Sequence, residues 1–280
     1  MPPITNALPD IDRTLAFFRT ENSNPRALTA VQIRDYNDNG YVSPIDIFSP
    51  SEAAANREEF DFLIASAQKT GHDGYSVHSC HIYRAAVHDM VTNAHILDCI
   101  EDLIGPDIVC WGTHFLSKMP DDGKRLSWHQ DASYWPLTPS KTVTVWLAID
   151  DADEENGAMQ VIPRSHLNGQ IPFERSTAEE QNILSQTVHN VQQFGDLPVS
   201  INLKSGQISL HSDLLLHGSK PNTSARRRCG LTIRYIPQDV RALNHWNLRS
   251  VICRGRDPSG HWSNVPRPEK DGVPPPQPKQ

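Results

Sequence analysis

The feature that most constrains the fold of this chain is a change of hydrophobic period near residue 107. Before this point, apolar residues recur every three or four positions, which is the spacing of the buried face of a helix. After it, short runs rich in Val, Ile, Thr and aromatic residues alternate with turn-forming clusters such as Pro-Asp-Asp-Gly at 120–123. Many short strands joined by turns are typical of a sandwich or barrel. We therefore predict a mainly β protein with a helical N-terminal layer packed on its β core.

Four helices are expected in the first 105 residues, and two of them have clear boundaries. One begins at 49–52 (S-P-S-E), carries apolar residues at helical spacing from Phe60 to Ala67 and ends at Gly71. The other runs from 93 to 104 and ends at Gly105-Pro106. The shorter elements are expected as helices at 11–19, 29–37 and 177–185, and as strands at 107–116, 142–149, 158–162, 207–211 and 231–235.

The length of 280 residues suits one sizeable domain, and the sequence contains no internal repeat. We expect a single domain over residues 1–268, helical from 1 to 105 and with the β core from 106 to 240. Residues 269–280 are rich in proline and are expected to form a disordered tail.

The composition excludes several kinds of partner and location. The formal charge of −7 gives no general attraction for nucleic acid or an anionic membrane. No window approaches 18 uninterrupted apolar residues, and the N-terminus lacks the basic and apolar regions of a secretory signal. The five scattered cysteines include no C-x-x-C pair, which is typical of reduced thiols. We expect a cytoplasmic monomer or homodimer that acts on a small-molecule substrate.

A histidine and an aspartate in the stretch S-W-H-Q-D-A-S-Y-W (127–135) form the first candidate functional group. His129 and Asp131 are two residues apart, so on a strand their side chains point to the same face. His217, which ends the apolar run in L-L-L-H-G-S-K-P-N, is the candidate third ligand. Two histidines and one carboxylate with open coordination positions form the facial triad of non-heme iron(II) oxygenases. On spacing alone an ordinary surface pair is equally favoured, because H-x-D is common by chance.

Four blocks of the sequence closely resemble the phytanoyl-CoA dioxygenase family. They are K-R-L-S-W-H-Q-D-A-S-Y-W-P-L, V-T-V-W-L-A-I-D-D-A-D-E-E-N-G-A-M-Q-V-I-P-R-S-H, H-S-D-L-L-L-H-G-S-K-P-N-T-S-A-R-R-R-C-G-L-T-I-R-Y and, earlier in the chain, H-I-L-D-C-I-E-D-L-I-G-P-D-I-V-C-W-G. The resemblance covers most of the chain from about residue 90 to 268. It implies a double-stranded β-helix (jelly-roll) core and an Fe(II)- and 2-oxoglutarate-dependent dioxygenase that consumes O2 and releases succinate and CO2.

The resemblance also implies a role for each matching residue. His129, Asp131 and His217 would be the iron ligands. Arg228, eleven positions after His217, and Ser219 would hold the distal carboxylate of 2-oxoglutarate, which suits a planar guanidinium. The remaining co-substrate pocket would be lined by Trp146, Gln130, Thr144 and Lys118. The carboxylate at Asp131 implies hydroxylation or another oxidation and not halogenation, because halogenating relatives carry Ala or Gly at that position.

The substrate is determined only as a class. The blocks H-Q-D-A-S-Y-W and R-G-R-D-x-x-G-H resemble bacterial members of the family more than the peroxisomal acyl-CoA enzyme. They favour hydroxylation of an unactivated C–H bond in a small polar metabolite, such as 2-aminoethylphosphonate or an amino-acid-like compound. An acyl-CoA or a natural-product scaffold is the alternative substrate, and a non-catalytic jelly-roll that binds a ligand and regulates is the alternative function. The candidate substrate contacts are Tyr134, Trp135, Asn222 and His114.

Neighbouring residues compete for two of these roles. His211 lies six positions before His217, but His217 is favoured as the ligand because H-G-S-x-x-N follows it. Arg226 and Arg227 stand directly before Arg228, and at least one of them is expected to be a solvated surface charge.

Two other metal-dependent classes fit the sequence poorly. His72-Asp73 and His88-Asp89 each spell the pair of HD-type phosphohydrolases, but those proteins are all-helical and half of this chain is predicted as strand. A cupin site requires H-x-H followed by a glutamate, which this chain lacks.

Overall fold

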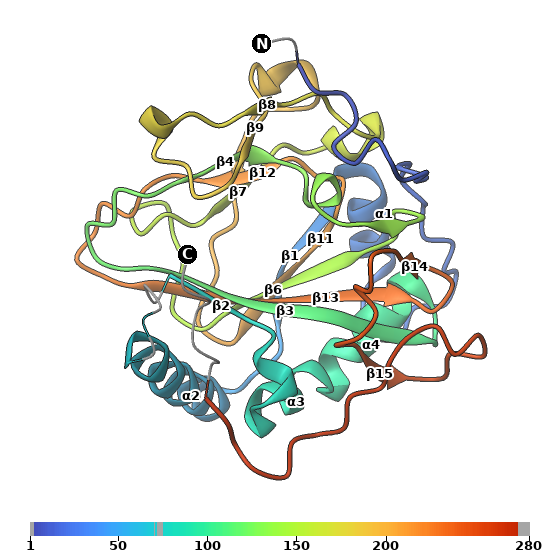
Figure 1. Ribbon diagram of the computed structural model, residues 1–280, viewed down its shortest axis with the longest axis vertical. Coiled ribbons are helices and arrows are strands. Elements are labelled where there is room, and N and C mark those ends of the chain that lie inside the picture. Colours follow the sequence, from blue (N-terminus) through green and yellow to red (C-terminus); the bar gives the residue numbers. More distant parts are fainter. Residues whose placement is uncertain (1–2, 70, 72–74, 274–280) are drawn as a thin grey trace.

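The computed structural model describes residues 3–69, 71 and 75–273, and it consists of two antiparallel sheets that face each other (Figure 1). In spatial order, the larger sheet contains β1 (Tyr41–Asp46), β11 (Gln207–Ser212), β6 (Val143–Ala148), β13 (Arg228–Pro237), β3 (Ile108–Lys118) and β15 (Val251–Arg254), with β2 (Ser76–His78) also paired to β3. The smaller sheet contains β10 (Val199–Ser200), β7 (Met159–Val161), β12 (His217–Ser219) and β4 (Leu126–His129). Two short pairs complete the strands: β5 (Leu137–Thr138) with β14 (Arg241–Ala242), and β8 (Glu174–Arg175) with β9 (Gln186–Thr187).

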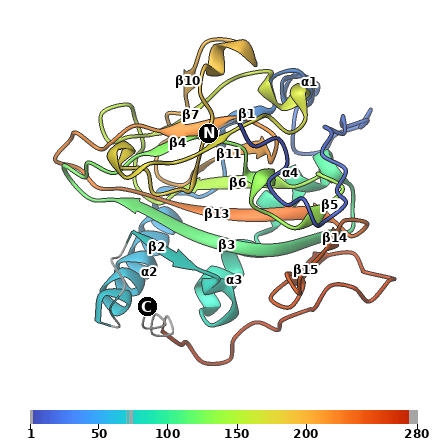
Figure 2. The same cartoon turned by 45° about the horizontal axis from the view of Figure 1, so that its top comes forward.

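Helices cover the outer face of the larger sheet. Helices α2 (Pro50–Lys69), α3 (Ala85–Val91) and α4 (Ala94–Ile104) lie on the side of β3 that faces away from the smaller sheet, whereas α1 (Ala30–Asn39) packs beside β1 (Figures 1 and 2). The buried cluster between helices and sheet takes Val145 and Leu147 from β6 and Leu231 and Ile233 from β13. Each fully buried side chain of this kind contributes roughly 1.5–3 kcal/mol. None of the described helices is long and apolar enough to cross a bilayer.

The inner face of the larger sheet lines a cavity between the two sheets. Because side chains alternate along a strand, the residues between the apolar ones point inward. Those that line the cavity are His114 and Leu116 on β3, Trp146 on β6, His211 on β11, and Arg228, Thr232 and Arg234 on β13. The central strands are therefore buried on both faces, with apolar residues on the helix side and mostly polar residues on the cavity side.

The two helices with clear sequence boundaries are confirmed as α2 and α4, and the predicted helix at 29–37 is α1, which Thr29 caps. No helix forms at 11–19, where the prediction is wrong. There, the Arg13 guanidinium donates to the carbonyl oxygens of Ala132 and Trp135, and the Thr14 amide donates to Thr138 Oγ1. These contacts hold the segment extended, because tertiary contacts outweigh a weak local helix propensity.

The strand regions predicted after residue 107 are confirmed as β3, β6, β7, β11 and β13. Two strands were missed in the N-terminal part, which was predicted as helical: β1 and β2 both join the larger sheet. The insertion 177–185 contains only one 3₁₀ turn, Ala178–Glu180. The His72-Asp73 pair and residues 274–280 of the predicted tail lie outside the described residues.

Two glycines on the cavity face of the larger sheet allow a matched test of this packing. A Cβ at Gly230 would overlap the Trp146 indole, whereas a Cβ at Gly112 would meet nothing closer than Arg234 Nη1 at 3.8 Å. We expect Gly230→Ala to lower the free energy of unfolding by about 1–3 kcal/mol, as overpacking does. Gly112→Ala should change it far less. Urea denaturation of both variants measures the difference, and equal stabilities would contradict the described packing of Trp146.

Candidate metal centre

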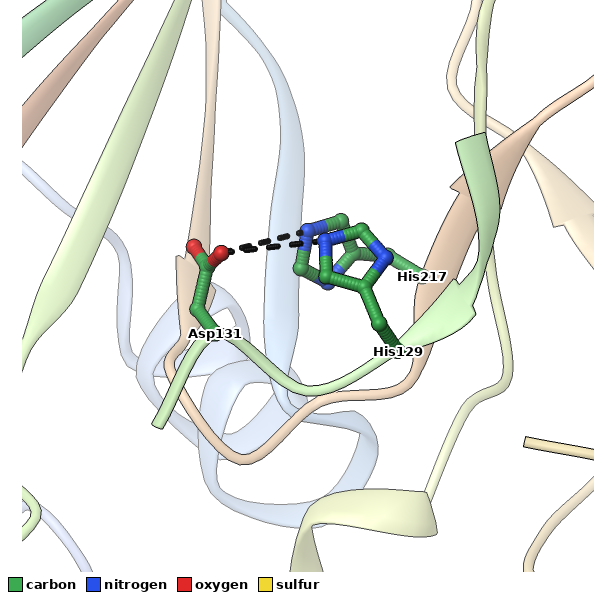
Figure 3. Close-up of side chains that lie close together, drawn as sticks. All are labelled: His129, Asp131 and His217. Atoms are coloured by element: carbon green, nitrogen blue, oxygen red, sulfur yellow. Dashed lines mark ion pairs between the residues drawn. The ribbon is translucent and has the colours of Figure 1, made fainter. Parts of the chain in front are cut away.

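Two histidines and one aspartate meet at the edge of the smaller sheet. His129 ends β4, His217 begins β12, and the two residues are directly paired across these strands. Asp131 follows β4 after one residue and starts a 3₁₀ turn. Its Oδ1 lies 3.7 Å from His129 Nε2 and 3.9 Å from His217 Nε2, and the three candidate ligand atoms all lie within 4.8 Å of one another. Figure 3 shows both imidazoles facing the same carboxylate.

The backbone fixes which nitrogen of each ring faces the centre. His129 Nδ1 lies 2.9 Å from the Ser127 carbonyl oxygen, and His217 Nδ1 lies 2.9 Å from the Leu215 carbonyl oxygen. A carbonyl can only accept, so each Nδ1 carries the proton and each Nε2 presents its lone pair to the centre. Burial, and next the neighbouring His217, hold the pKa of His129 well below its usual range. His129 is therefore neutral at physiological pH, as a metal ligand must be.

The chemistry of this donor set fits ferrous iron. Two imidazole nitrogens and one carboxylate oxygen leave coordination positions open, which is the arrangement of the iron(II) oxygenases. Within residues 3–69, 71 and 75–273, no other group of three or more His, Cys, Asp or Glu side chains converges in this way. The predicted set of three residues is thus brought together in space.

The triad lines a cavity with a volume of about 110 Å³. Polar side chains without hydrogen-bond partners lie at one end of this cavity. Arg228 lines it with a guanidinium 5.7 Å from the Trp146 ring centre, and its buried Nε has no hydrogen-bond partner. The Ser219 hydroxyl is also buried without a partner. Unpaired buried donors are costly unless a ligand satisfies them, so this end of the cavity fits a carboxylate.

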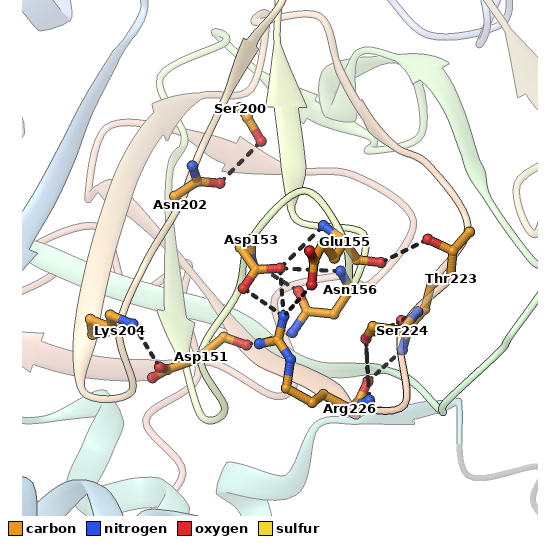
Figure 4. Close-up of polar contacts among 11 residues, drawn as sticks. Asp151, Asp153, Glu155, Asn156, Ser200, Asn202, Lys204, Thr223, Ser224 and Arg226 are labelled. Atoms are coloured by element: carbon orange, nitrogen blue, oxygen red, sulfur yellow. Dashed lines mark hydrogen bonds and ion pairs between the residues drawn. The ribbon is translucent and has the colours of Figure 1, made fainter.

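Ion pairs distinguish Arg228 from the two arginines before it. Arg226 pairs with Asp153 at 2.8 Å and Glu155 at 3.3 Å, and it joins the loops around these residues on the outside of the barrel (Figure 4). Arg227 pairs with Asp150 at 2.7 Å and also with Asp61 of α2. Of the three neighbouring arginines, Arg228 is therefore the one that lines the cavity.

Among the other residues expected around the co-substrate, Trp146 lines the cavity wall. Thr144 lies two residues earlier on β6 and is buried, with an unpaired Oγ1. Lys118 is buried, and its Nζ donates to the carbonyl oxygens of Ser219 and Lys220. Burial, followed by the nearby Arg228 charge, lowers the pKa of Lys118 to about 6.

Gln130 was expected to line the co-substrate pocket, but in the structure it binds the backbone of neighbouring loops. Its amide donates to the carbonyl oxygens of Gly169 and Leu214 and accepts from the Ile171 amide. The residue between the two candidate ligands His129 and Asp131 therefore points the opposite way from them. It anchors neighbouring loops and does not line the cavity.

The structure places the four candidate substrate contacts in different surroundings. His114 lines the cavity, and its Nε2 lies 2.6 Å from Ser76 Oγ. The Tyr134 ring meets His129 edge-on with ring centres 6.0 Å apart, whereas Trp135 packs against Trp111 in a neighbouring apolar cluster. Asn222 was expected near substrate, but its amide donates to the carbonyl oxygens of Met119 and Arg226 and stabilises a turn.

Two cavity residues were missed as functional candidates. His211, which was considered only as a competing ligand, lines the cavity with its ring centre 4.9 Å from that of His217. Burial lowers the pKa of His211 to about 3, so its ring is neutral. Arg234 was not considered at all. The predicted strand at 231–235 did not reach Arg228, whereas the observed β13 begins there, so that residues 228, 230, 232 and 234 share a face.

Comparison with known proteins identifies the family. The family model for phytanoyl-CoA dioxygenase (PhyH) matches residues 36–230. The chain belongs to the phytanoyl-CoA dioxygenase family. The matched region includes the whole His–Asp–His cluster as well as Ser219 and Arg228.

Individual relatives agree with the family in fold and chemistry. A probable alpha-ketoglutarate-dependent hypophosphite dioxygenase from Stutzerimonas stutzeri is 29% identical over 252 residues, which are 81% of this chain and 86% of that protein. Peroxisomal phytanoyl-CoA dioxygenase from Bos taurus is 30% identical over 173 residues, which are 58% of this chain but only 50% of that protein. The chain thus spans about half the length of the peroxisomal relatives.

Solved structures support the same architecture. The non-heme monooxygenase ThoJ superposes with a TM-score of 0.71 and 25% identity, covering 85% of this chain and 88% of that one. EctD from S. alaskensis, solved with 2-oxoglutarate and 5-hydroxyectoine, gives a TM-score of 0.70 at 20% identity and covers 94% of this chain and 95% of that one.

The family and its chemistry are therefore those that the sequence predicted. This protein is an iron(II)- and 2-oxoglutarate-dependent dioxygenase with a jelly-roll core, and O2 is its second co-substrate.

Removing the carboxylate of the triad should weaken metal binding. We expect Asp131→Ala to lower the affinity for Fe(II) by about 100-fold or more, since even the loss of a group that only supports a ligand costs roughly 10- to 100-fold. Anaerobic calorimetric titration with Fe(II) measures the affinity. The exposed His189 serves as the control, because His189→Ala removes an imidazole that lies outside the triad and the cavity. Unchanged affinity of Asp131→Ala would mean that another carboxylate holds the metal.

Proposed function

We propose that this dioxygenase hydroxylates a C–H bond of a small, polar metabolite. His129, Asp131 and His217 would hold the iron, and Arg228 and Ser219 would hold the distal carboxylate of 2-oxoglutarate. One observation carries the proposal: a His–Asp–His cluster shares a cavity with a buried arginine whose Nε has no partner.

The chain's own residues prepare the site before any ligand enters. When bound, iron(II) supplies the oxidation of the substrate C–H bond by O2 at the expense of 2-oxoglutarate. The carbonyl oxygens of Ser127 and Leu215 hold the Nδ1 protons of the two histidines, so neither ring must reorient to present Nε2. Arg228 and Ser219 offer N–H and O–H donors at a fixed distance from the triad, which sets the co-substrate's direction. Apolar side chains in the cavity wall help to exclude water from the site; they are Leu116, Leu126 and Met159.

The lining of the cavity favours a small, polar substrate. His114, Thr232 and Arg234 add polar groups to its wall beside the triad and Arg228. Relatives named for hypophosphite and for L-proline hydroxylation also act on small polar molecules. 2-Aminoethylphosphonate and amino-acid-like compounds remain the named possibilities. An acyl-CoA or natural-product substrate would require the cavity to open at Ile183 and Leu184, which line it.

The alternative of a non-catalytic ligand-binding protein receives no support. The triad is complete, and the family members with which the chain aligns are dioxygenases.

The role of Arg228 can be tested by co-substrate binding. Anaerobic Fe(II) and 2-oxoglutarate should give the weak visible absorption of their chelate in the wild-type protein. We expect Arg228→Met to raise the dissociation constant for 2-oxoglutarate by about 10- to 100-fold, because hydrogen bonds to charged groups are worth about 1.5–3 kcal/mol. Titration of the visible band measures both proteins.

Arg226 provides the matched control, since it stands two positions earlier and points outside the barrel. Arg226→Met should leave the dissociation constant within about twofold of wild type. Absence of the band in the wild-type protein, together with no succinate release for any substrate, would refute the proposed function. A normal band in Arg228→Met would refute only the role of that residue.

A further inference from the structure

Arg234 is a second arginine in the metal cavity that the proposed function does not use. It lines the same cavity as the triad and Arg228. Arg228 lies six positions earlier on the same strand, β13. Asp131 is the carboxylate whose charge acts on it most, yet none of the ion pairs among the described residues joins the two. The buried Nε of Arg234 has no hydrogen-bond partner.

Two tryptophans flank the Arg234 guanidinium. The guanidinium carbon lies 5.3 Å from the Trp111 ring centre and 4.9 Å from the Trp135 ring centre. The two indole planes lie 72° apart, so the guanidinium does not stack face-to-face on both. Cation–π attraction to the rings confines the guanidinium without a hydrogen-bond acceptor, and its Nε stays without a partner.

Two further unpaired groups lie beside Arg234 on the same face of the sheet. Arg234 of β13 pairs in register with Thr144 of β6, and Thr144 pairs in register with His211 of β11. Directly opposite residues project to the same face at a Cβ separation of about 4.5–5.5 Å. Thr144 Oγ1 and both ring nitrogens of His211 are buried without partners. Three adjacent strands thus present a row of polar groups that nothing in the described chain satisfies.

The charges of the cavity point to the kind of ligand that completes this row. Among its charged lining residues, one carboxylate, Asp131, faces two guanidiniums, Arg228 and Arg234. In the proposed complex, the ferrous dication and the 2-oxoglutarate dianion balance each other. One positive charge then remains without a counter-charge, which is unfavourable in a buried site.

We propose that Arg234, flanked by Thr144 and His211, binds the oxyanion group of the substrate, so that the substrate is a small phosphorus oxyanion or carboxylate. This inference rests on the proposed function and names the substrate class of that same site. The anion would lie at the opposite end of the β13 row from the co-substrate's distal carboxylate. The C–H or P–H bond to be hydroxylated would then be held near the triad.

Three compounds that share a 2-aminoethyl group but differ in head group test the proposal. 2-Aminoethylphosphonate carries a phosphorus oxyanion, β-alanine a carboxylate, and ethanolamine neither. Each is titrated anaerobically into the wild-type protein with Fe(II) and 2-oxoglutarate, and binding is followed by the shift of the visible band and by tryptophan fluorescence. Hypophosphite is added as a fourth probe, without the aminoethyl group.

We expect at least one of the anions to bind, and ethanolamine not to bind. Preference for 2-aminoethylphosphonate or hypophosphite would identify a phosphorus oxyanion, and preference for β-alanine a carboxylate. Arg234→Met should weaken binding of the preferred anion at least tenfold while leaving the 2-oxoglutarate affinity within twofold of wild type. Arg234→Lys, which keeps the charge, should retain part of the affinity.

Arg267→Met is the control variant, because Arg267 pairs with Asp89 of α3 outside the cavity. It should bind both co-substrate and anion as the wild type does.

Several results would overturn the inference and leave the proposed function standing. They are a normal chelate band with no anion binding at millimolar concentrations, equal binding of ethanolamine and the anions, or unchanged anion affinity in Arg234→Met. Loss of 2-oxoglutarate affinity in Arg234→Met, with the fold intact by circular dichroism, would instead assign Arg234 to the co-substrate. Absence of the band in the wild-type protein, together with no succinate release for any substrate, would refute the proposed function itself.

Discussion

The pairing of β12 with β4 is the interaction on which the site depends. It sets His217 directly opposite His129, and Ser219, two residues further along β12, faces the same cavity. A slip of one residue would turn His217 to the other face of the sheet and destroy the cluster. The backbone contributes again through the carbonyls that accept from each Nδ1, so that both the position and the orientation of the rings follow from strand geometry.

The larger sheet makes this site possible because it is buried on two sides. Along β13, Leu231 and Ile233 pack into the apolar layer formed with the helices, while Thr232 and Arg234 face the cavity. The favourable burial on the helix side offsets the cost of keeping unpaired polar groups on the other side. A ligand that meets those groups recovers the cost, which connects the architecture of the fold to recognition of charged small molecules.

Local sequence was sufficient wherever a segment's own residues decide its structure. Helices α2 and α4 have clear apolar stripes and boundaries, and both were predicted. The segment 11–19 was mispredicted because Arg13 binds backbone more than a hundred residues away. β1 was missed for a similar reason, since its partner is β11, which begins at Gln207. Likewise, the run of Arg226, Arg227 and Arg228 could be divided into surface and cavity residues only by their partners Asp153, Asp150 and Asp61.

The sequence by itself determined the reaction class, because the blocks that resemble the phytanoyl-CoA dioxygenase family carry His129, Asp131, His217 and Arg228, whereas the H-x-D spacing alone left an ordinary surface pair equally favoured. It also determined the β core through the period-two runs after residue 107. Only the tertiary structure decided which other polar residues meet on the cavity-facing side of the larger sheet. Arg234, Thr144 and His211 are far apart in the chain and become neighbours through the register of three strands. That register arises from cooperative packing of the whole sheet against its helices, which no local stretch of sequence contains.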